Sequence, residues 1–261
     1  MKGIVKVGGY GEKRDRLRLA TPRASKSANV YGLSVDVFIF PILLPIIGFL
    51  VPLPNSLATN DLKSAEQAVE VMGHKLETVS RYRCKLHTVS ISGSLQEERI
   101  IDYTFRRPRL IQMRILSGKN RGSALVYKNG VVRGHRGGLL SWIVLTFKPS
   151  DPDVTTIRGG RVDQSDFLFI MDVLRNAMKE GKLRLENTTG SLNGKEHYRL
   201  SLLQHVDPLE KGAEAGTFWI DSEDLVVSKY ELYDKNGQLI YRQIHDQLEL
   251  NAPLPDGQFK L

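Results

Sequence analysis

The sequence of 261 residues contains one cysteine, Cys84, so no disulfide can form within the chain. Its stability must therefore come from the burial of apolar surface. We expect Cys84 to be a small buried residue of a strand, because no motif places a general base beside it.

The common catalytic and metal-binding motifs are also missing. The sequence has no His-Glu-x-x-His, Gly-x-Ser-x-Gly, Walker or Cys-x-x-Cys pattern. Its six histidines are scattered without the paired spacing of metal ligands. We therefore predict a protein that is not an enzyme, binds no metal and needs no cofactor.

The sequence does contain one long apolar run, residues 37–53, which has no charged residue. Eight Lys and Arg residues precede it, and Ser56-Leu57-Ala58 follows with the small residues that signal peptidase prefers. We predict that residues 1–58 are a targeting segment for export and that residues 59–261 form the functional domain. The alternative is a retained membrane anchor, because a run of 17 residues reaches the lower limit for spanning a bilayer.

Beyond residue 58 the strong positive charge of the chain disappears. The whole sequence has a net charge of +8, but residues 59–261 have 29 basic and 26 acidic side chains. A nucleic-acid partner is therefore not expected. These roughly 200 residues suffice for one domain with a substantial core.

Two segments have the periodicity of amphipathic helices. Apolar side chains recur every three or four positions in residues 62–79 and again in residues 165–178. Each helix needs an apolar surface to cover. The expected caps are Asn60 or Asp61 for the first helix and Asp163 or Ser165 for the second, which Gly181 ends.

Most of the remaining sequence is typical of antiparallel strands joined by short turns. Asn129-Gly130 and Asn236-Gly237 predict two hairpins, because both residue types tolerate a positive φ. Alternation predicts that one face is apolar and the other exposed to water. The apolar face has two sets of residues, one on each side of an Arg-Pro break: Ile101, Tyr103 and Phe105, then Ile111, Met113 and Ile115.

Further strands are expected at residues 183–186, 196–203, 216–221, 225–234 and 238–250. So many sequential strands with only two helices predict an α+β fold. The expected architecture is an incomplete antiparallel β-barrel of ten or eleven strands with a lid of α-helices. Such a sheet would leave an apolar cavity beneath the lid.

The break at Arg106-Arg107-Pro108-Arg109-Leu110 resembles the Lys/Arg-Arg-Pro strand break of the periplasmic lipoprotein carrier LolA and its relatives. The order of the expected elements also agrees with that family over most of residues 60–250. The stretch from Arg106 through residues 134–140 (GHRGGLL) is more similar to an uncharacterised bacterial branch of the superfamily, known mainly as a domain of unknown function.

The resemblance implies a location and a set of binding residues. In LolA the arginine of this break binds the backbone of a lid helix, and an aromatic residue four positions later lines the acyl-chain cavity; here these positions are Arg107 and Ile111. The family fold implies that the apolar face binds the ligand. The predicted ligand-binding residues are Tyr103, Phe105, Arg107, Ile111, Met113, Ile115, Tyr127, Phe167 and Met171.

The resemblance implies a monomeric periplasmic carrier of lipid or lipoprotein acyl chains that exchanges its cargo with a membrane-bound donor or acceptor protein. The alternative is an envelope sensor or interaction module of the same fold, which binds a protein partner instead of transporting lipid. A cavity filled by the protein's own side chains would favour this alternative.

Overall fold

The computed structural model describes residues 62–186, 190–192, 194–204 and 209–261, all of which belong to the unit Pro54–Leu261. The predicted targeting segment, residues 1–58, lies outside the described residues, as do the expected caps Asn60 and Asp61. Within the described ranges, no helix is both long and apolar enough to cross a membrane.

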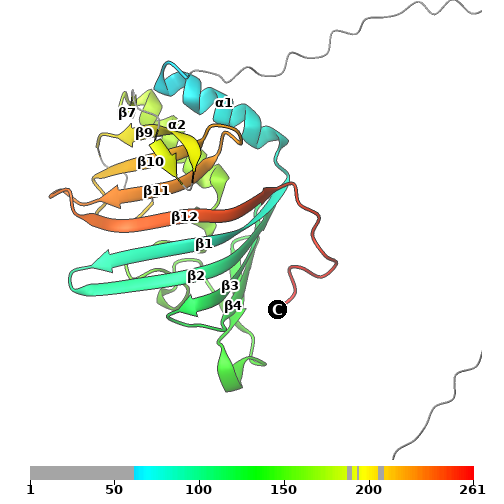
Figure 1. Ribbon diagram of the computed structural model, residues 1–261. Helices are drawn as coiled ribbons and strands as arrows, with labels where there is room; N and C mark the ends of the chain where they lie inside the picture. The colour runs from blue at the N-terminus through cyan, green and yellow to red at the C-terminus, as the bar shows by residue number, and fades with distance from the viewer. Residues whose placement is uncertain (1–61, 187–189, 193, 205–208) are drawn as a thin grey trace, which may run out of the picture. The chain divides into compact units, whose positions relative to one another are not determined.

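The described chain forms one large antiparallel sheet with two helices (Figure 1). The helices are α1 (Ala65–Thr78) and α2 (Phe167–Lys179). The strands are β1 (Arg81–Ser92), β2 (Leu95–Arg106), β3 (Leu110–Gly118), β4 (Ala124–Lys128), β5 (Val131–His135), β6 (Leu145–Phe147), β7 (Leu183–Leu185), β8 (Gly190–Leu192), β9 (Lys195–Leu202), β10 (Ala215–Asp221), β11 (Val227–Tyr233) and β12 (Leu239–Leu250).

The strand order is β6-β5-β4-β3-β2-β1-β12-β11-β10-β9-β7, and β8 pairs with β9. Two meanders are therefore joined where the first strand pairs with the last. Strands β6 and β7 do not pair with each other, so the sheet stays open. The predicted incomplete barrel with a helical lid is confirmed, with twelve described strands instead of ten or eleven; the short β8 was not expected.

The predicted alternation around the Arg-Pro break is confirmed by the pairing of β2 with β3. Ile101 lies opposite Ile115, Tyr103 opposite Met113 and Phe105 opposite Ile111, so all six side chains share one face of the sheet. We call this the inner face. The apolar residues of both helices belong to the same core as Tyr103 and Phe105, and Phe167 of α2 packs against Tyr82 of β1.

The two predicted hairpins are also present. Asn129 and Gly130 connect β4 to β5 with φ angles of 51° and 79°, which a two-residue turn of this kind requires. In the β11–β12 hairpin the carboxylate of Asp234 accepts hydrogen bonds from the backbone N–H groups of Asn236 and Gln238 at 2.8 and 2.9 Å.

The expected helix caps were wrong, although the helices themselves are where the periodicity placed them. Ser64 caps α1, since its hydroxyl accepts from the N–H of Gln67 at 3.2 Å. Asp166 caps α2 by accepting from Phe169 at 2.9 Å. The two residues expected to cap α2 form other contacts. Asp163 pairs with Arg161, and the Ser165 hydroxyl donates to Val162 O. Gly181 follows the last turn of α2 as expected, and its N–H donates to Met178 O at 3.0 Å.

The space between the helices and the inner face is filled by large side chains. The ring of Tyr82 on β1 lies 5.0 Å from that of Phe105 and 4.5 Å from that of Phe167 on α2. Cys84 is buried in β1 as predicted, and its burial raises the thiol pKa well above the ordinary value. The fully buried side chains of this region include Met72, Tyr82, Tyr103, Phe105, Ile111, Ile170, Met171 and Leu174.

The outer face of the sheet is not entirely exposed to water, which corrects the prediction for that face. Residues 251–261 follow β12 and reach the outer face of β2 and β3. There the side-chain amide of Gln258 donates to Thr104 Oγ1 at 3.2 Å and to Gln112 Oε1 at 2.7 Å. Thr104 and Gln112 are buried as a result. The alternation of polar and apolar residues in β2 and β3 could not predict that residues 251–261 cover this face, because they lie about 150 positions away in the sequence.

Candidate functional site

The segment between β6 and α2 crosses the inner face of the sheet. We call residues 152–165 the strap; it contains two short 3₁₀ turns, Pro152–Val154 and Val162–Gln164. Polar contacts attach it to the sheet: Arg158 Nη1 donates to Ile91 O at 2.9 Å, and the N–H of Ile157 donates to Glu97 Oε2 at 3.3 Å. The strap therefore covers part of the inner face without pairing as a strand.

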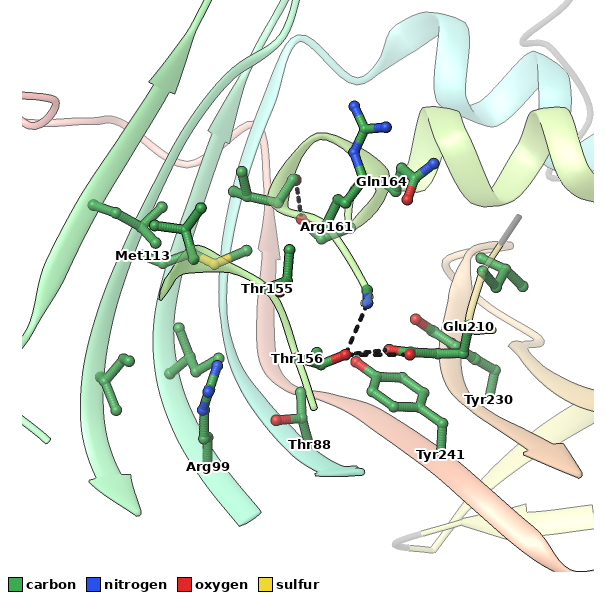
Figure 2. Close-up of a pocket in the computed structure, with 18 residues that line it drawn as sticks. Thr88, Arg99, Met113, Thr155, Thr156, Arg161, Gln164, Glu210, Tyr230 and Tyr241 are labelled. Carbon is green, nitrogen blue, oxygen red and sulfur yellow. Dashed lines mark hydrogen bonds between the residues drawn. The ribbon is translucent and has the colours of Figure 1, made fainter. Parts of the chain in front are cut away.

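Beneath and beside the strap are two adjacent hollows, which we together call the groove. The inner hollow has a volume of about 70 Å³ and the outer one about 320 Å³. Six residues line both of them, so the hollows share a wall: Arg99, Met113, Ile115, Leu125, Val154 and Thr155. Figure 2 shows the inner hollow, with Arg99 and Met113 on the strands and Thr155 on the strap.

The inner hollow is mainly apolar, whereas apolar and polar side chains line the outer hollow in similar measure. Ile101 extends the apolar surface inward, and Leu145 and Phe147 extend it outward toward β6. Arg99 pairs with the buried carboxylate of Glu97, and the Nε of Arg99 has no hydrogen-bond partner among the described residues. A groove of this composition suits an amphiphile, which needs apolar contact along its chain and polar contact at one end.

Cations also lie at the outer end of the groove. Lys119 Nζ is 3.8 Å from Glu97 Oε1, and Arg136 Nη2 is 3.3 Å from Asp153 Oδ1. Both basic side chains are well exposed, so these pairs are weak and can rearrange toward a ligand. In the described ranges no group of three or more His, Cys, Asp or Glu side chains is placed to hold a metal ion.

A buried carboxyl group holds the inner end of the strap. Glu210 accepts from the Thr156 hydroxyl at 3.2 Å, as Figure 2 shows. Burial raises the pKa of Glu210 to about 7, an effect that the hydrogen bond from Thr156 and the charge of Arg158 only partly oppose. The carboxyl group therefore changes charge near neutral pH.

Behind this carboxyl group a chain of polar side chains runs through the core. The hydroxyls of Tyr230 and Tyr241 donate to Gln243 Oε1 at 3.2 and 2.8 Å, and Gln243 Nε2 lies 3.1 Å from His245 Nε2. Complete burial lowers the pKa of His245 to about 3, so this imidazole is neutral at physiological pH.

The titration of Glu210 predicts a pH-dependent stability. Because the folded state raises this pKa from 4.5 to about 7, the contribution of Glu210 is fully present below pH 4.5 and is lost as the pH rises through 7. Glu210→Gln stays neutral and keeps an acceptor for Thr156. We expect its free energy of unfolding to gain up to about 3 kcal/mol over wild type between pH 5 and pH 8.

Urea unfolding of both proteins at the two pH values measures this difference. Glu97, Tyr230 and Tyr241 also interact electrostatically with Glu210, but they are the same in the two proteins, so their effects largely cancel. If Glu210→Gln and wild type differed in stability by the same amount at pH 5 and pH 8, Glu210 would not titrate between these pH values in the folded protein.

The structure places only two of the nine predicted ligand-binding residues in the groove, namely Met113 and Ile115. Six others lie in the packed core: Tyr103, Phe105, Ile111, Tyr127, Phe167 and Met171. Tyr103 and Tyr127 belong to strands that line the groove elsewhere, but the core encloses their own rings. As ligand contacts these six stay a prediction that requires the helices to move.

The ninth residue, Arg107, lies at the strand break and contacts α1. Its Nε donates to Val79 O at 2.8 Å and its Nη2 to Leu76 O at 2.7 Å, so it satisfies carbonyls at the C-terminal end of α1. The resemblance implied such a bond to helix backbone. Contact of Arg107 with a ligand is still a prediction.

Arg109, two positions further on, contacts the other helix. Its Nε lies 2.8 Å from Oδ2 of Asp166, the fully buried cap of α2. The strand break therefore attaches both helices to the sheet, one through Arg107 and one through Arg109. This contact could not be predicted from the sequence, because nothing local to Arg109 indicates that Asp166 lies opposite.

Most of the groove was not predicted from the sequence. Its other lining residues come from the sheet, the strap and the segment before β10, and include Arg99, Leu125, Val154, Thr156 and Glu210. Alternation signals the inward direction of Leu125 on β4. The strap has no periodicity, so no pattern could have placed Thr156 next to Glu210, 54 positions away.

Comparison with known proteins adds to the description of the fold. No family model matches this chain, and no curated protein matches it. Among solved structures it is similar to a LolA-superfamily protein from Nitrosomonas europaea, with 12% identity, 77% of this chain and 99% of that chain covered, and a TM-score of 0.37.

It is also similar to the lipoprotein LppX of Mycobacterium tuberculosis, with 11% identity, 73% and 97% coverage and a TM-score of 0.46. A third likeness is to MucB in the MucA/MucB complex of Pseudomonas aeruginosa, with 14% identity, 76% of this chain and 60% of that chain covered, and a TM-score of 0.42. These likenesses do not identify a ligand for this chain.

Proposed function

We propose that this protein binds the aliphatic chain of a lipid, or of a lipid-modified protein, in the groove and carries it within the bacterial cell envelope. In this proposal it acts in the periplasm as a monomer, without catalysis. One observation carries the proposal: beside the packed core lies a groove with a mainly apolar inner hollow and an outer hollow of mixed apolar and polar lining that opens to solvent.

The walls of the groove supply the affinity. Met113, Ile115 and Leu125 present adjacent apolar side chains from β3 and β4, and Val154 covers them from the strap. Each methylene that leaves water for such a surface contributes about 0.8 kcal/mol, so a chain of several methylenes binds without any specific polar contact. Met113 can adapt its shape to different chains, because its side chain is flexible and unbranched.

The charged groups at the groove favour a cargo with an acidic or polar end. Lys119 and Arg136 lie beside the outer hollow, where the head group of a lipid would emerge. Their present partners, Glu97 and Asp153, hold them by contacts of 3.3 to 3.8 Å that a phosphate or carboxylate can replace.

Uptake and release require the strap to move. Its connections to the sheet are single hydrogen bonds rather than a strand ladder, as at Ile157 and Arg158. A small displacement would connect the two hollows into one longer channel. A membrane-bound donor or acceptor protein that grips the strap would shift this equilibrium toward the open form.

The test is to purify the full chain from its native host, extract it with organic solvent and identify bound lipids by mass spectrometry. We expect about one amphiphile per protein, and uptake of a fluorescent fatty acid after the lipid is removed. A protein that carries no lipid and takes up no fatty acid would contradict the proposal.

One observation favours a second function, that of an interaction module. Tyr82, Tyr103, Phe105 and Phe167 are buried and pack against one another beneath α2, so this part of the inner face is occupied by the protein's own side chains. A protein partner would then bind the outside of the helices or the strap. Cross-linking in intact cells would reveal such a partner, and its binding should not change when the groove is blocked.

A further inference from the structure

The basic residues of the domain are concentrated in one part of the chain. From position 103 to position 150 the sequence has ten Lys and Arg residues and no Asp or Glu. The rest of residues 59–261 has 19 basic and 26 acidic side chains. The segment 103–150 includes all of strands β3, β4, β5 and β6, which form one edge region of the sheet. The domain is therefore strongly positive at this edge and negative elsewhere.

The loop between β5 and β6 lies at this positive edge and exposes large apolar side chains. Leu139 is 95% exposed and Trp142 is 78% exposed, and Val144 and Leu145 are also exposed. We call residues 138–145 the apolar loop. The exposure of neighbouring Trp and Leu side chains to water is unfavourable in free energy. We therefore expect this loop to contact a partner surface.

The base of the apolar loop is fixed against the turn between β3 and β4. The N–H of Gly137 donates to the Ser123 hydroxyl at 3.1 Å, and a Cβ at Gly137 would lie 2.4 Å from Arg121 O. This close approach requires glycine and brings Arg121 to the base of the loop. These contacts hold the base of the apolar loop in place.

Several cations near the loop are free. Arg114, Arg121 and Arg133 are exposed and form no ion pair within the described part of the chain. Lys128 and Lys148 are also exposed and unpaired there, at the other end of the β4–β5 hairpin. Arg136, at the start of the loop, pairs only with Asp153, at 3.3 Å. Unneutralised cations around exposed Trp and Leu side chains match the interface of a bilayer with anionic lipids, where tryptophan is enriched and basic residues are attracted to the surface.

We propose that the apolar loop docks onto an anionic lipid bilayer, with Leu139 and Trp142 in the interface and the surrounding arginines and lysines above the head groups. This goes beyond the proposed binding of an acyl chain and does not depend on it. The two would work together, because His135, Arg136, Leu145 and Phe147 beside the loop also line the outer hollow. Docking would bring the open end of the groove to the membrane surface.

The test uses the fluorescence of Trp142 in the full chain without cargo. The sequence has two tryptophans, so Trp219→Phe leaves Trp142 as the only reporter. In vesicles of phosphatidylglycerol and phosphatidylcholine we expect a blue shift and strong quenching by lipids brominated near the head group. With phosphatidylcholine alone the quenching should be several-fold weaker, and added salt should reduce the phosphatidylglycerol effect.

Matched variants separate docking from other sources of membrane binding. Leu139→Ser and Arg133→Glu/Arg136→Glu should reduce quenching of Trp142 several-fold. Lys179→Glu/Arg184→Glu changes the net charge equally but acts on α2 and β7, and it should leave the quenching unchanged. In Trp142→Phe the remaining Trp219 should not be quenched, which gives a second measurement if Trp219→Phe folds poorly.

These readouts follow one residue, so insertion of the apolar run 37–53 into vesicles does not imitate them. Trp142 that stays unquenched with phosphatidylglycerol, or is quenched equally by phosphatidylcholine alone, would overturn the proposal. A blue shift that depends on protein concentration and not on vesicles would also overturn it, and would assign the loop to contact with a second copy of the chain. Failure of the acyl-chain proposal would leave all these signals unchanged.

Discussion

Arg109→Met is expected to lower the free energy of unfolding by about 3 kcal/mol, measured by urea unfolding at pH 7. Arg109 is the ion-pair partner of Asp166, which is 0% exposed and caps α2. Without the guanidinium the carboxylate stays buried and uncompensated. We place the effect at the low end for a broken buried pair, because 34% of the Arg109 side chain is exposed and solvent screens part of the interaction.

The neighbouring Arg106 provides the control. It stacks on Phe259 at the outer face, 5.1 Å from the ring centroid, and is exposed. Arg106→Met should therefore cost less than about 1 kcal/mol. If the two variants lost equal stability, Arg109 would have no special role at α2.

A double-mutant cycle tests the pairing itself. Burial raises the pKa of Asp166, and Arg109 opposes this effect, so removal of the arginine should raise the pKa further. Asp166→Asn can still cap the helix but carries no charge. In the Asp166→Asn background, Arg109→Met should therefore cost much less than it does in wild type.

Ile115→Trp is expected to reduce the affinity for a fluorescent fatty acid by at least tenfold. Ile115 lines both hollows, and an indole ring at this position would fill much of the space where they meet. Loss of contact with even two methylenes amounts to about 1.6 kcal/mol, which is more than a tenfold change in affinity. Because the indole enters existing space, the cost in folding stability should be small.

Leu116 is a closely matched control for this substitution. It follows Ile115 on β3, points to the opposite face of the sheet and is 44% exposed. Leu116→Trp adds the same ring outside the groove and should leave the affinity unchanged. An equal loss in both variants, or none in either, would place fatty-acid binding outside the groove, for example on the apolar run 37–53.

Local patterns were enough to predict the two helices and most of the strands of this fold. Alternation in the sequence placed Tyr103, Phe105, Ile111 and Met113 on one face, and the pairing of β2 with β3 confirms it. The Asn-Gly turn at position 129 fixed a hairpin in the same way. These predictions succeed because side-chain direction in a strand and the φ angles of a tight turn depend only on neighbouring residues.

Local patterns could not predict which part of the inner face is packed against other side chains and which part lines the groove. Periodicity shows that Phe105 and Ile115 point inward, but not that Phe105 is buried against Tyr82 while Ile115 faces open space. That difference depends on where α2 and the strap come to lie. Those positions depend on contacts such as Arg109 with Asp166 and Thr156 with Glu210, whose partners are more than 50 positions apart in the sequence.

The most direct test of the account is to map where an acyl chain binds. A fatty acid with a photoreactive group at the end of its chain would be bound to the full protein, cross-linked by light and located by peptide mass spectrometry. We predict labelling in residues 99–125 and 145–156, competed by unlabelled fatty acid and reduced in Ile115→Trp. Label found only in other peptides, such as the apolar run 37–53, or in none, would contradict the account.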